Sequence, residues 1–168
     1  AESFPDATEA APTMENPDTF QLSPSPESVP NVPQDTGLSL QDIYEKVIDA
    51  VVSISCSYPG GSSTGSGVIL STEGYVVTNA HVVEGAAQIQ VLLTDGRNLE
   101  ASLIGADKIS DLAVLKIPAE GLVAAQLGDS SVLRVGDAVV AIGDPLGVAL
   151  RGTMTDGIIS AINRDMTL

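Results

Sequence analysis

Short apolar segments separated by turn residues recur along the chain from Ala50 to Ile162. The first segment has a period of two, since Val52, Ile54 and Cys56 alternate with serines. Side chains that alternate in this way face opposite sides of a β-strand. Strands spaced by about 8–12 residues predict an antiparallel barrel or sandwich. No helical pattern separates the segments, which disfavours a doubly wound α/β fold.

Turn residues mark the ends of the individual strands. Asp95-Gly96 is a strong hairpin signal, and Pro118 ends an apolar run. The predicted strands are 50–58, 67–70, 75–78, 88–94, 99–104, 111–117, 137–142 and 153–162. A short helix is predicted ahead of them, because Ser39 can cap a segment with apolar residues at helical spacing, namely Leu40, Ile43, Tyr44, Val47 and Ile48.

Residues 1–36 differ in composition from the rest of the chain. They contain seven acidic residues, seven prolines and no Lys or Arg. Charge repulsion and proline stiffness keep such a segment extended, and few of its side chains could be buried. We expect a disordered, acidic, Pro-rich linker, with folding beginning near Gly37. The last apolar run reaches Leu168 without a turn signal, so we expect the chain to be cut within its final domain.

The net charge of −15 limits the classes of partner. Nucleic acids and anionic membrane surfaces are polyanions, which argues against both. Cys56 is the one cysteine, so it can form no disulfide within the chain, and its place on an apolar face predicts a buried thiol. No apolar run reaches 18 residues. The chain begins at Ala1 without a signal peptide, which predicts a processed or internal piece of a longer protein.

The single histidine, His81, lies at the end of a predicted strand, and Asp111 opens another strand thirty residues later. Each alone has an ordinary explanation, because a lone histidine is more often structural and aspartate commonly begins a strand in solvent. A buried carboxylate bonded to an imidazole fixes its tautomer and leaves the second nitrogen free to take a proton from a hydroxyl. We therefore predict that His81 and Asp111 are two members of a serine-protease triad, whose nucleophile the chain does not show.

Two serine motifs match nucleophile signatures and are rejected. Gly61-Ser62-Ser63-Thr64-Gly65 has the G-x-S-x-G letters of a nucleophile elbow, which needs a strand, a sharp turn and a helix. Pro59-Gly60 precedes it and a β run follows, so we predict a flexible loop. Gly128-Asp129-Ser130-Ser131 resembles a G-D-S-G sequence but lacks the final glycine, and we predict a turn there.

Other site chemistries lack the residues they need. One histidine and one cysteine cannot make a tetrahedral zinc set without unusual carboxylate use. An aspartic-protease dyad would need two carboxylates in matching glycine-rich frames, and no such repeat is visible. No phosphate-binding G-x-x-x-x-G-K-[ST] loop occurs either. We therefore predict neither a metal nor a cofactor.

Seven short motifs follow one another in the folded part of the chain. They are Gly65–Ile69, Thr78–Val83, Asp111–Lys116, Leu127–Ser130, Val135–Asp137, Ala141–Gly143 and Gly157–Ser160. Several ordered motifs at such spacing are far more specific than any one of them. With them the chain resembles the HtrA/Deg family of trypsin-like serine proteases, from about Asp42 to its end.

The resemblance implies an all-β, chymotrypsin-like double β-barrel with the site in the cleft between the barrels. The first barrel, with its short helix, would be complete and occupy residues 37–123, and residues 124–168 would be a truncated second barrel. His81 and Asp111 would act from the first barrel as base and orienting acid. A serine in a G-N-S-G-G frame, which also supplies oxyanion-hole N–H groups, would follow Leu168. The chain by itself would then be inactive.

The resemblance also implies substrates, partners and location. Members of the family cut unfolded or misfolded proteins outside the cytoplasm, in protein quality control and without a cofactor. They usually form homotrimers and carry a downstream PDZ domain, and a membrane anchor would lie upstream of Ala1, joined by the acidic linker. At Asp144 the family more often has Asn. That loop lies near the active site in relatives, so substrate preference could differ.

Two other functions stay open. A protease-like module that binds unfolded proteins or partners without cleaving them would share every motif of the chain. Intact His81 and Asp111 favour the enzyme, since a dead protease has no chemical need to keep them. A β-barrel binding domain with a chance His and Asp would require several motifs to agree by accident, and it ranks last.

Overall fold

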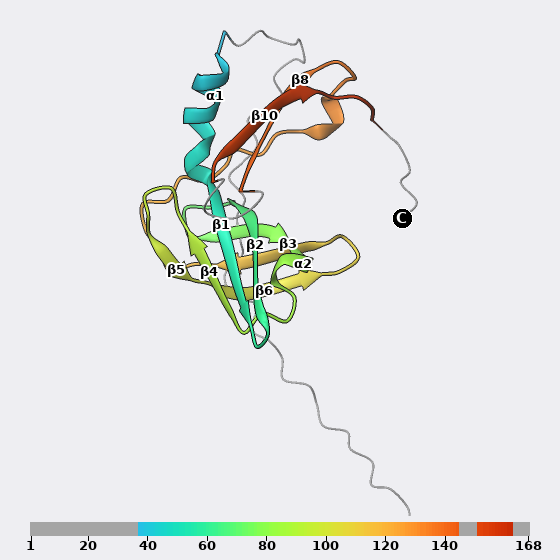
Figure 1. Ribbon diagram of the computed structural model, residues 1–168. Helices are drawn as coiled ribbons and strands as arrows, with labels where there is room; N and C mark the ends of the chain where they lie inside the picture. Colours follow the sequence, from blue (N-terminus) through green and yellow to red (C-terminus); the bar gives the residue numbers. More distant parts are fainter. Residues whose placement is uncertain (1–36, 145–150, 163–168) are drawn as a thin grey trace, which may run out of the picture.

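A seven-stranded antiparallel sheet forms the larger part of the computed structural model, which describes residues 37–144 and 151–162 (Figure 1). The order of its strands is β5-β4-β1-β2-β3-β7-β6. The strands are β1 (Val51–Tyr58), β2 (Gly61–Ile69), β3 (Tyr75–Asn79), β4 (Gln88–Leu92), β5 (Asn98–Glu100), β6 (Ser102–Asp107) and β7 (Leu112–Lys116). The two edge strands, β5 and β6, are consecutive in the chain and separated only by Ala101. The sheet therefore curls round until this continuous segment closes it into a barrel.

Aliphatic side chains fill the barrel. On β1, Val52, Ile54 and Cys56 are buried, as the period of two predicts. One residue departs from that pattern, because Ser53 is also buried although it points to the opposite face. The interior is tightly packed, and a methyl group at Gly67 would lie 2.8 Å from both an Ile54 and a Val76 methyl. Glycine at this position lets the neighbouring side chains meet across the barrel.

Two strand predictions need correction. Residues 61–65, predicted to be a flexible loop, are the first half of β2. A two-residue turn at Pro59-Gly60 places Gly61 opposite Tyr58, and the backbone then pairs with β1 through Val68. The pattern of small polar residues concealed this pairing, since each side chain adds little apolar surface. The predicted strand 99–104 is divided at Ala101 into β5 and β6, because its two halves pair with different neighbours.

The predicted helix is present as α1 (Leu40–Val47), followed by the 3₁₀ turn η1 (Ile48–Ala50), which leads directly into β1. Ser39 and Asp42 form a capping box. The Ser39 Oγ accepts from the Asp42 N–H at 3.1 Å, and the Asp42 carboxylate accepts from the Ser39 N–H at 2.8 Å. Two satisfied N–H groups explain why so short a helix begins here.

The second unit of the described chain is a two-stranded antiparallel sheet of β8 (Ala138–Gly143) and β10 (Thr153–Ile158). In Figure 1, α1 runs alongside this sheet, above the barrel. Leu40 and Ile43 of α1 line one side of an apolar groove of about 330 Å³, and residues of β8 and β10 line the other. The predicted strand 153–162 ends earlier, at Ile158, and the predicted turn at 128–131 leads into the 3₁₀ turn η2 (Ser130–Val132).

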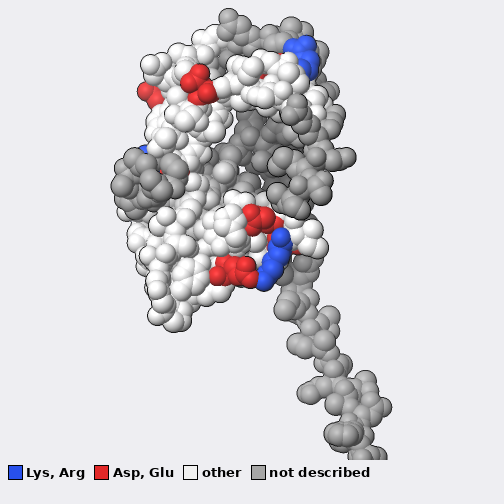
Figure 2. Space-filling model, turned by 45° about the vertical axis from the view of Figure 1, so that its right-hand side comes forward, with Lys and Arg blue, Asp and Glu red and all other residues white. Residues whose placement is uncertain are grey.

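Several expectations lie outside the described residues or are not decided by them. The acidic segment 1–36 is outside, so its predicted disorder stays a prediction, as do the domain boundaries near residues 37 and 124. Within 37–144 and 151–162, no helix has the length and apolar character needed to cross a membrane. Figure 2 shows charged side chains of both signs in small separate groups on one face, without an extended basic surface there.

Candidate active site

The pairing of β3 with β7 brings His81 beside Asp111. These strands are antiparallel, with Asn79 at the end of β3 opposite Leu112 at the start of β7. The chain then turns into α2 (Ala80–Val83), a single helical turn that carries His81. The Ala80 N–H donates to the Asp111 carbonyl at 3.1 Å, which continues the ladder by one bond. Two residues thirty positions apart in sequence therefore meet at one end of the barrel.

The Asp111 carboxylate contacts His81 through both of its oxygens. The His81 ring Nδ1 lies 2.7 Å from Oδ2, and the His81 backbone N–H donates to Oδ1 at 2.9 Å. Asn79 adds two further bonds, because its Nδ2 donates to Oδ2 at 3.1 Å and to the Asp111 carbonyl at 3.2 Å. Asp111 has a φ of +54°. Among the described residues, it is the one non-glycine residue with a positive φ. These bonds hold a backbone conformation that aspartate rarely adopts.

The same bonds keep the carboxylate charged. The backbone N–H of His81, followed by its ring, lowers the pKa of Asp111 below its ordinary value because both donate to the ionised form. Both groups of the pair are accessible in the described chain, since the Asp111 side chain is 41% exposed and that of His81 is 70% exposed. The Nδ1 of the His81 ring is bonded to Asp111. The second ring nitrogen, Nε2, forms no hydrogen bond with any of the described residues.

The β1–β2 hairpin supports α2 from the other side. Its Tyr58 hydroxyl donates to the Val82 carbonyl at 2.9 Å, and its Ser63 Oγ donates to the same carbonyl at 3.1 Å. Val82, the residue after His81, is buried, and its side chain packs over Gly65. Sequence reasoning missed the parts played by Asn79, Tyr58 and Ser63. Only the position of Asn79 beside His81 in the motif was a signal.

Comparisons with known proteins show the family to which the chain belongs. A profile of the trypsin-like peptidase domain matches residues 65–167. A probable periplasmic serine endoprotease, DegP-like, of Halomonas elongata is 43% identical over 180 residues, which cover 99% of this chain. A serine protease Do-like HtrA of Bacillus subtilis is 48% identical over 111 residues, or 64% of this chain. The chain belongs to the HtrA/Deg family of trypsin-like serine peptidases.

Solved structures confirm the chymotrypsin-like, all-β fold of this HtrA/Deg chain. An HtrA-type protease, AlgW with tripeptide, aligns with a TM-score of 0.72 and 44% identity over 76% of this chain. A serine endoprotease from Yersinia pestis aligns with a TM-score of 0.68 and 41% identity over 74% of it. The matches cover 42% and 45% of those structures, and 37% and 25% of the Halomonas and Bacillus proteins. The HtrA/Deg chain thus spans less than half of the relatives it matches.

The serines of the two rejected nucleophile motifs lie in regular elements of the described chain. Ser62 and Ser63 belong to β2, and Ser63 donates to the Val82 carbonyl, so the G-x-S-x-G letters form no elbow. Ser130 and Ser131 belong to η2, which Asp129 caps by accepting from the Ser131 N–H at 2.8 Å. Among the described residues, no serine hydroxyl bonds the His81 ring. Those residues also contain no cluster of three or more His, Cys, Asp or Glu that could hold a metal.

Asp144 joins the second sheet to the barrel of the HtrA/Deg chain. It lies just after β8 and is 2% exposed. Its carboxylate accepts from the Ser53 hydroxyl of β1 and, at 2.6 Å, from the Gly152 N–H just before β10. Its own N–H donates to the Ser66 Oγ of β2 at 2.7 Å. The bond to Asp144 explains why Ser53 is buried although it points away from the barrel core.

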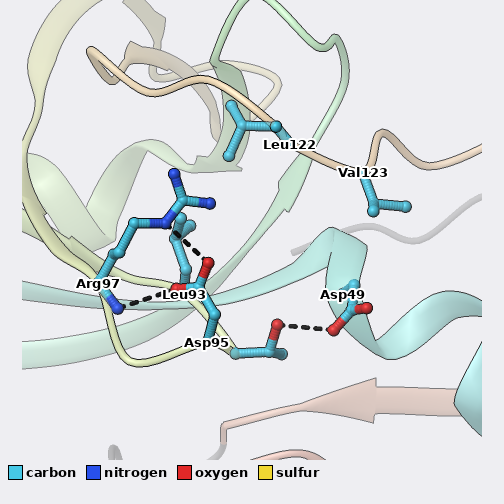
Figure 3. A pocket seen from close by; sticks show the side chains of 8 residues that line it. Asp49, Leu93, Asp95, Arg97, Leu122 and Val123 are labelled. Carbon is cyan, nitrogen blue, oxygen red and sulfur yellow. Dashed lines mark hydrogen bonds and ion pairs between the residues drawn. The ribbon is translucent and has the colours of Figure 1, made fainter.

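A small cavity of about 100 Å³ lies elsewhere, between the turn at 93–97 and residues 121–123 (Figure 3). Its charged groups are already paired. The Arg97 Nε donates to the Asp95 carboxylate at 2.7 Å, and the Thr94 hydroxyl donates to Asp49 at 2.7 Å. His81 and Asp111 do not line it. The cavity therefore offers no unpaired group for chemistry, and the candidate active site is the His81–Asp111 pair.

Proposed function

We propose that this chain supplies the general base and the orienting acid of a Ser-His-Asp endopeptidase. The observation that carries the proposal is the 2.7 Å contact between the His81 Nδ1 and the Asp111 Oδ2. It leaves the second ring nitrogen at an exposed position, free of bonds to the described residues. Membership of a serine-peptidase family supports the assignment of this geometry to proton transfer.

The chemistry follows from the two ring nitrogens. With Nδ1–H donating to Asp111, Nε2 is unprotonated and can take the proton of a serine hydroxyl as that oxygen attacks a peptide carbonyl. The Asp111 carboxylate, whose pKa is lowered, stays charged and stabilises the imidazolium that forms. His81 then gives the proton to the leaving amine. The pair moves a proton in both directions, while the bond to Asp111 holds the ring in one orientation.

The nucleophile, in this proposal, comes from outside the described residues. We place it in a G-N-S-G-G frame following Leu168, with the oxyanion-hole N–H groups in the same segment. The 168-residue chain alone then has no peptidase activity. Completion of the second barrel around β8 and β10 would bring the serine to His81.

Substrates and location are proposed from the relatives. Their names describe periplasmic serine endoproteases, which supports an extracytoplasmic location for this protein. We propose that it cuts unfolded or misfolded proteins in quality control, with the acidic segment 1–36 as a tether to a membrane anchor. A homotrimer and a downstream PDZ domain belong to the same proposal.

The test is to read the coding sequence beyond Leu168 and to assay casein hydrolysis by the encoded protein. We expect a serine in a G-N-S-G-G frame, hydrolysis by the extended protein, and none by the 168-residue chain. His81→Ala in the extended protein should remove about 10⁴-fold or more of kcat. A stop codon directly after Leu168, or another residue at the serine position, would contradict the proposal and favour a binding module without catalysis.

A further inference from the structure

The helical turn that carries His81 has little support of its own. α2 has four residues, and its N-terminal flanking residue, Asn79, directs its side chain to Asp111 instead of capping the turn. The last carbonyls of any helix lack partners within the helix. In α2, the Ala80 and Val83 carbonyls accept from the Glu84 and Ala86 N–H groups. The Val82 carbonyl accepts from two side chains of another element.

Those side chains form a compact polar group on the β1–β2 hairpin. The Tyr58 hydroxyl and the Ser63 Oγ lie 3.2 Å apart, and each donates to the Val82 carbonyl, at 2.9 and 3.1 Å. The Val82 methyls also fit against Gly65, where a methyl group would lie 2.8 Å and 2.9 Å from them. The hairpin therefore fixes both the backbone and the side chain of the residue that follows His81.

A competing use for these hydroxyls would be to activate the neighbouring thiol of Cys56. That thiol is fully buried, and burial raises its pKa above the ordinary value, outweighing the opposing effect of the nearby Ser63 and Tyr58 hydroxyls. A thiol with a raised pKa stays protonated and unreactive at neutral pH. The Tyr58 and Ser63 hydroxyls therefore act on the Val82 carbonyl, which belongs to the residue after His81.

We propose that Tyr58 and Ser63 are positioning residues for His81: together they anchor the Val82 carbonyl and so hold the imidazole in line with Asp111. This inference rests on the proposed function, because it assigns a role in catalysis only if His81 is the base. Both residues bond the backbone of Val82 and not the His81 ring. Their effect passes through one peptide unit, because Val82 directly follows His81 in a turn of four residues.

The test uses His81 as the one histidine of the 168-residue chain. When the chain is labelled with ¹⁵N-histidine, the NMR signals of the two ring nitrogens can come only from His81, so they need no assignment to a residue. In the wild type we expect an Nδ1-protonated ring with a low-field Nδ1–H proton that exchanges slowly with water. Tyr58→Phe/Ser63→Ala should speed that exchange about tenfold or more, since it removes both bonds to the Val82 carbonyl. The backbone spectrum of the barrel strands should change little.

Matched variants separate positioning from general damage. Ser62→Ala alters an exposed hydroxyl on the same strand and should leave the ring signals unchanged. Tyr58→Phe/Ser63→Thr keeps one hydroxyl and should restore slow exchange. If the double variant fails to fold, Tyr58→Phe alone is compared with the wild type, and an intermediate exchange rate is expected. In the extended protein, the double variant should lower kcat about tenfold with little change in KM.

The outcomes distinguish this inference from the proposed function. Identical ring signals and exchange rates in the wild type and in a folded double variant would overturn the positioning role and leave the function standing. A wild-type ring protonated at Nε2, or without a low-field proton, would overturn both, because His81 would then not be oriented by Asp111. Slow exchange in the wild type and fast exchange in the double variant supports both.

Discussion

At the scale of single residues, Asp111 decides the orientation of the His81 ring. Asp111→Asn would replace an acceptor by an amide that can donate to Nδ1, which favours the wrong tautomer. In the extended protein we expect kcat for casein hydrolysis to fall about 10⁴-fold, with the fold unchanged. Asp95→Asn, an exposed acid in another turn, is the control. Full activity of Asp111→Asn would show that this carboxylate does not orient the base.

Asp111 should also contribute to stability in a pH-dependent way. Its pKa is lowered in the folded chain, mainly by the His81 backbone N–H and then by the ring. Its contribution is therefore present above the unfolded pKa of about 3.9 and is lost as pH falls through the folded value. Urea unfolding at about pH 7 and at about pH 3 should show that the advantage of the wild type over Asp111→Asn is smaller at the lower pH. An advantage of equal size at both pH values would contradict this.

His81 and Asp111 were assigned to one site because one ends a predicted strand, the other begins one, and together they match two members of a triad. Their catalytic role stays a prediction. The supporting residues could not be read in the same way. Asn79, Tyr58 and Ser63 act through hydrogen bonds that depend on strand register, and a hydroxyl in a run of small polar residues carries no sign of its partner. The positive φ of Asp111 could not be predicted from the sequence either, since aspartate is common in every kind of turn.

At the scale of elements, the turn before β3 depends on the absence of a side chain at Gly74. Its φ is +95°, and a Cβ there would overlap the Ile117 carbonyl oxygen. Gly96 provides a matched control, because its φ is +92° and a methyl group there would meet no described heavy atom within 4 Å beyond its chain neighbours. We expect Gly74→Ala to lower the free energy of unfolding by about 1–3 kcal/mol more than Gly96→Ala, measured in urea. Equal losses would mean that only the backbone conformation matters.

Strands were predicted best where apolar residues alternate with polar ones. The period of two on β1 reports directly which side chains enter the barrel. The first half of β2 was missed, because Gly61 to Gly65 pair through the backbone and add little to the core. The division at Ala101 was missed for another reason. A strand that changes partners as a barrel closes keeps one apolar pattern, and only the three-dimensional sheet shows the change.

At the scale of the whole molecule, the barrel and the second sheet meet at a buried polar contact. Asp144 bonds Ser53 and Ser66 of the barrel and Gly152 beside β10. Resemblance to the family suggested an effect of this residue on substrate preference, since Asn is more common there. The structure also gives Asp144 a structural role. Its buried carboxylate accepts hydrogen bonds from Gly152 and from Ser53, which lies 91 residues away in the sequence.

Replacing Asp144 tests whether this contact holds the two units together. Asp144→Ala leaves the buried Ser53 hydroxyl and the Gly152 N–H without an acceptor, and each unsatisfied group costs about 1–3 kcal/mol. We expect a loss of about 2 kcal/mol or more in urea unfolding. Asp144→Asn should cost less than about 1 kcal/mol, because its amide oxygen can accept from Gly152 while its NH₂ donates to Ser53. Asp156→Ala, on exposed β10, should change little. Equal losses for the Ala and Asn variants would show that the charge, and not the hydrogen bonding, joins the sheet to the barrel.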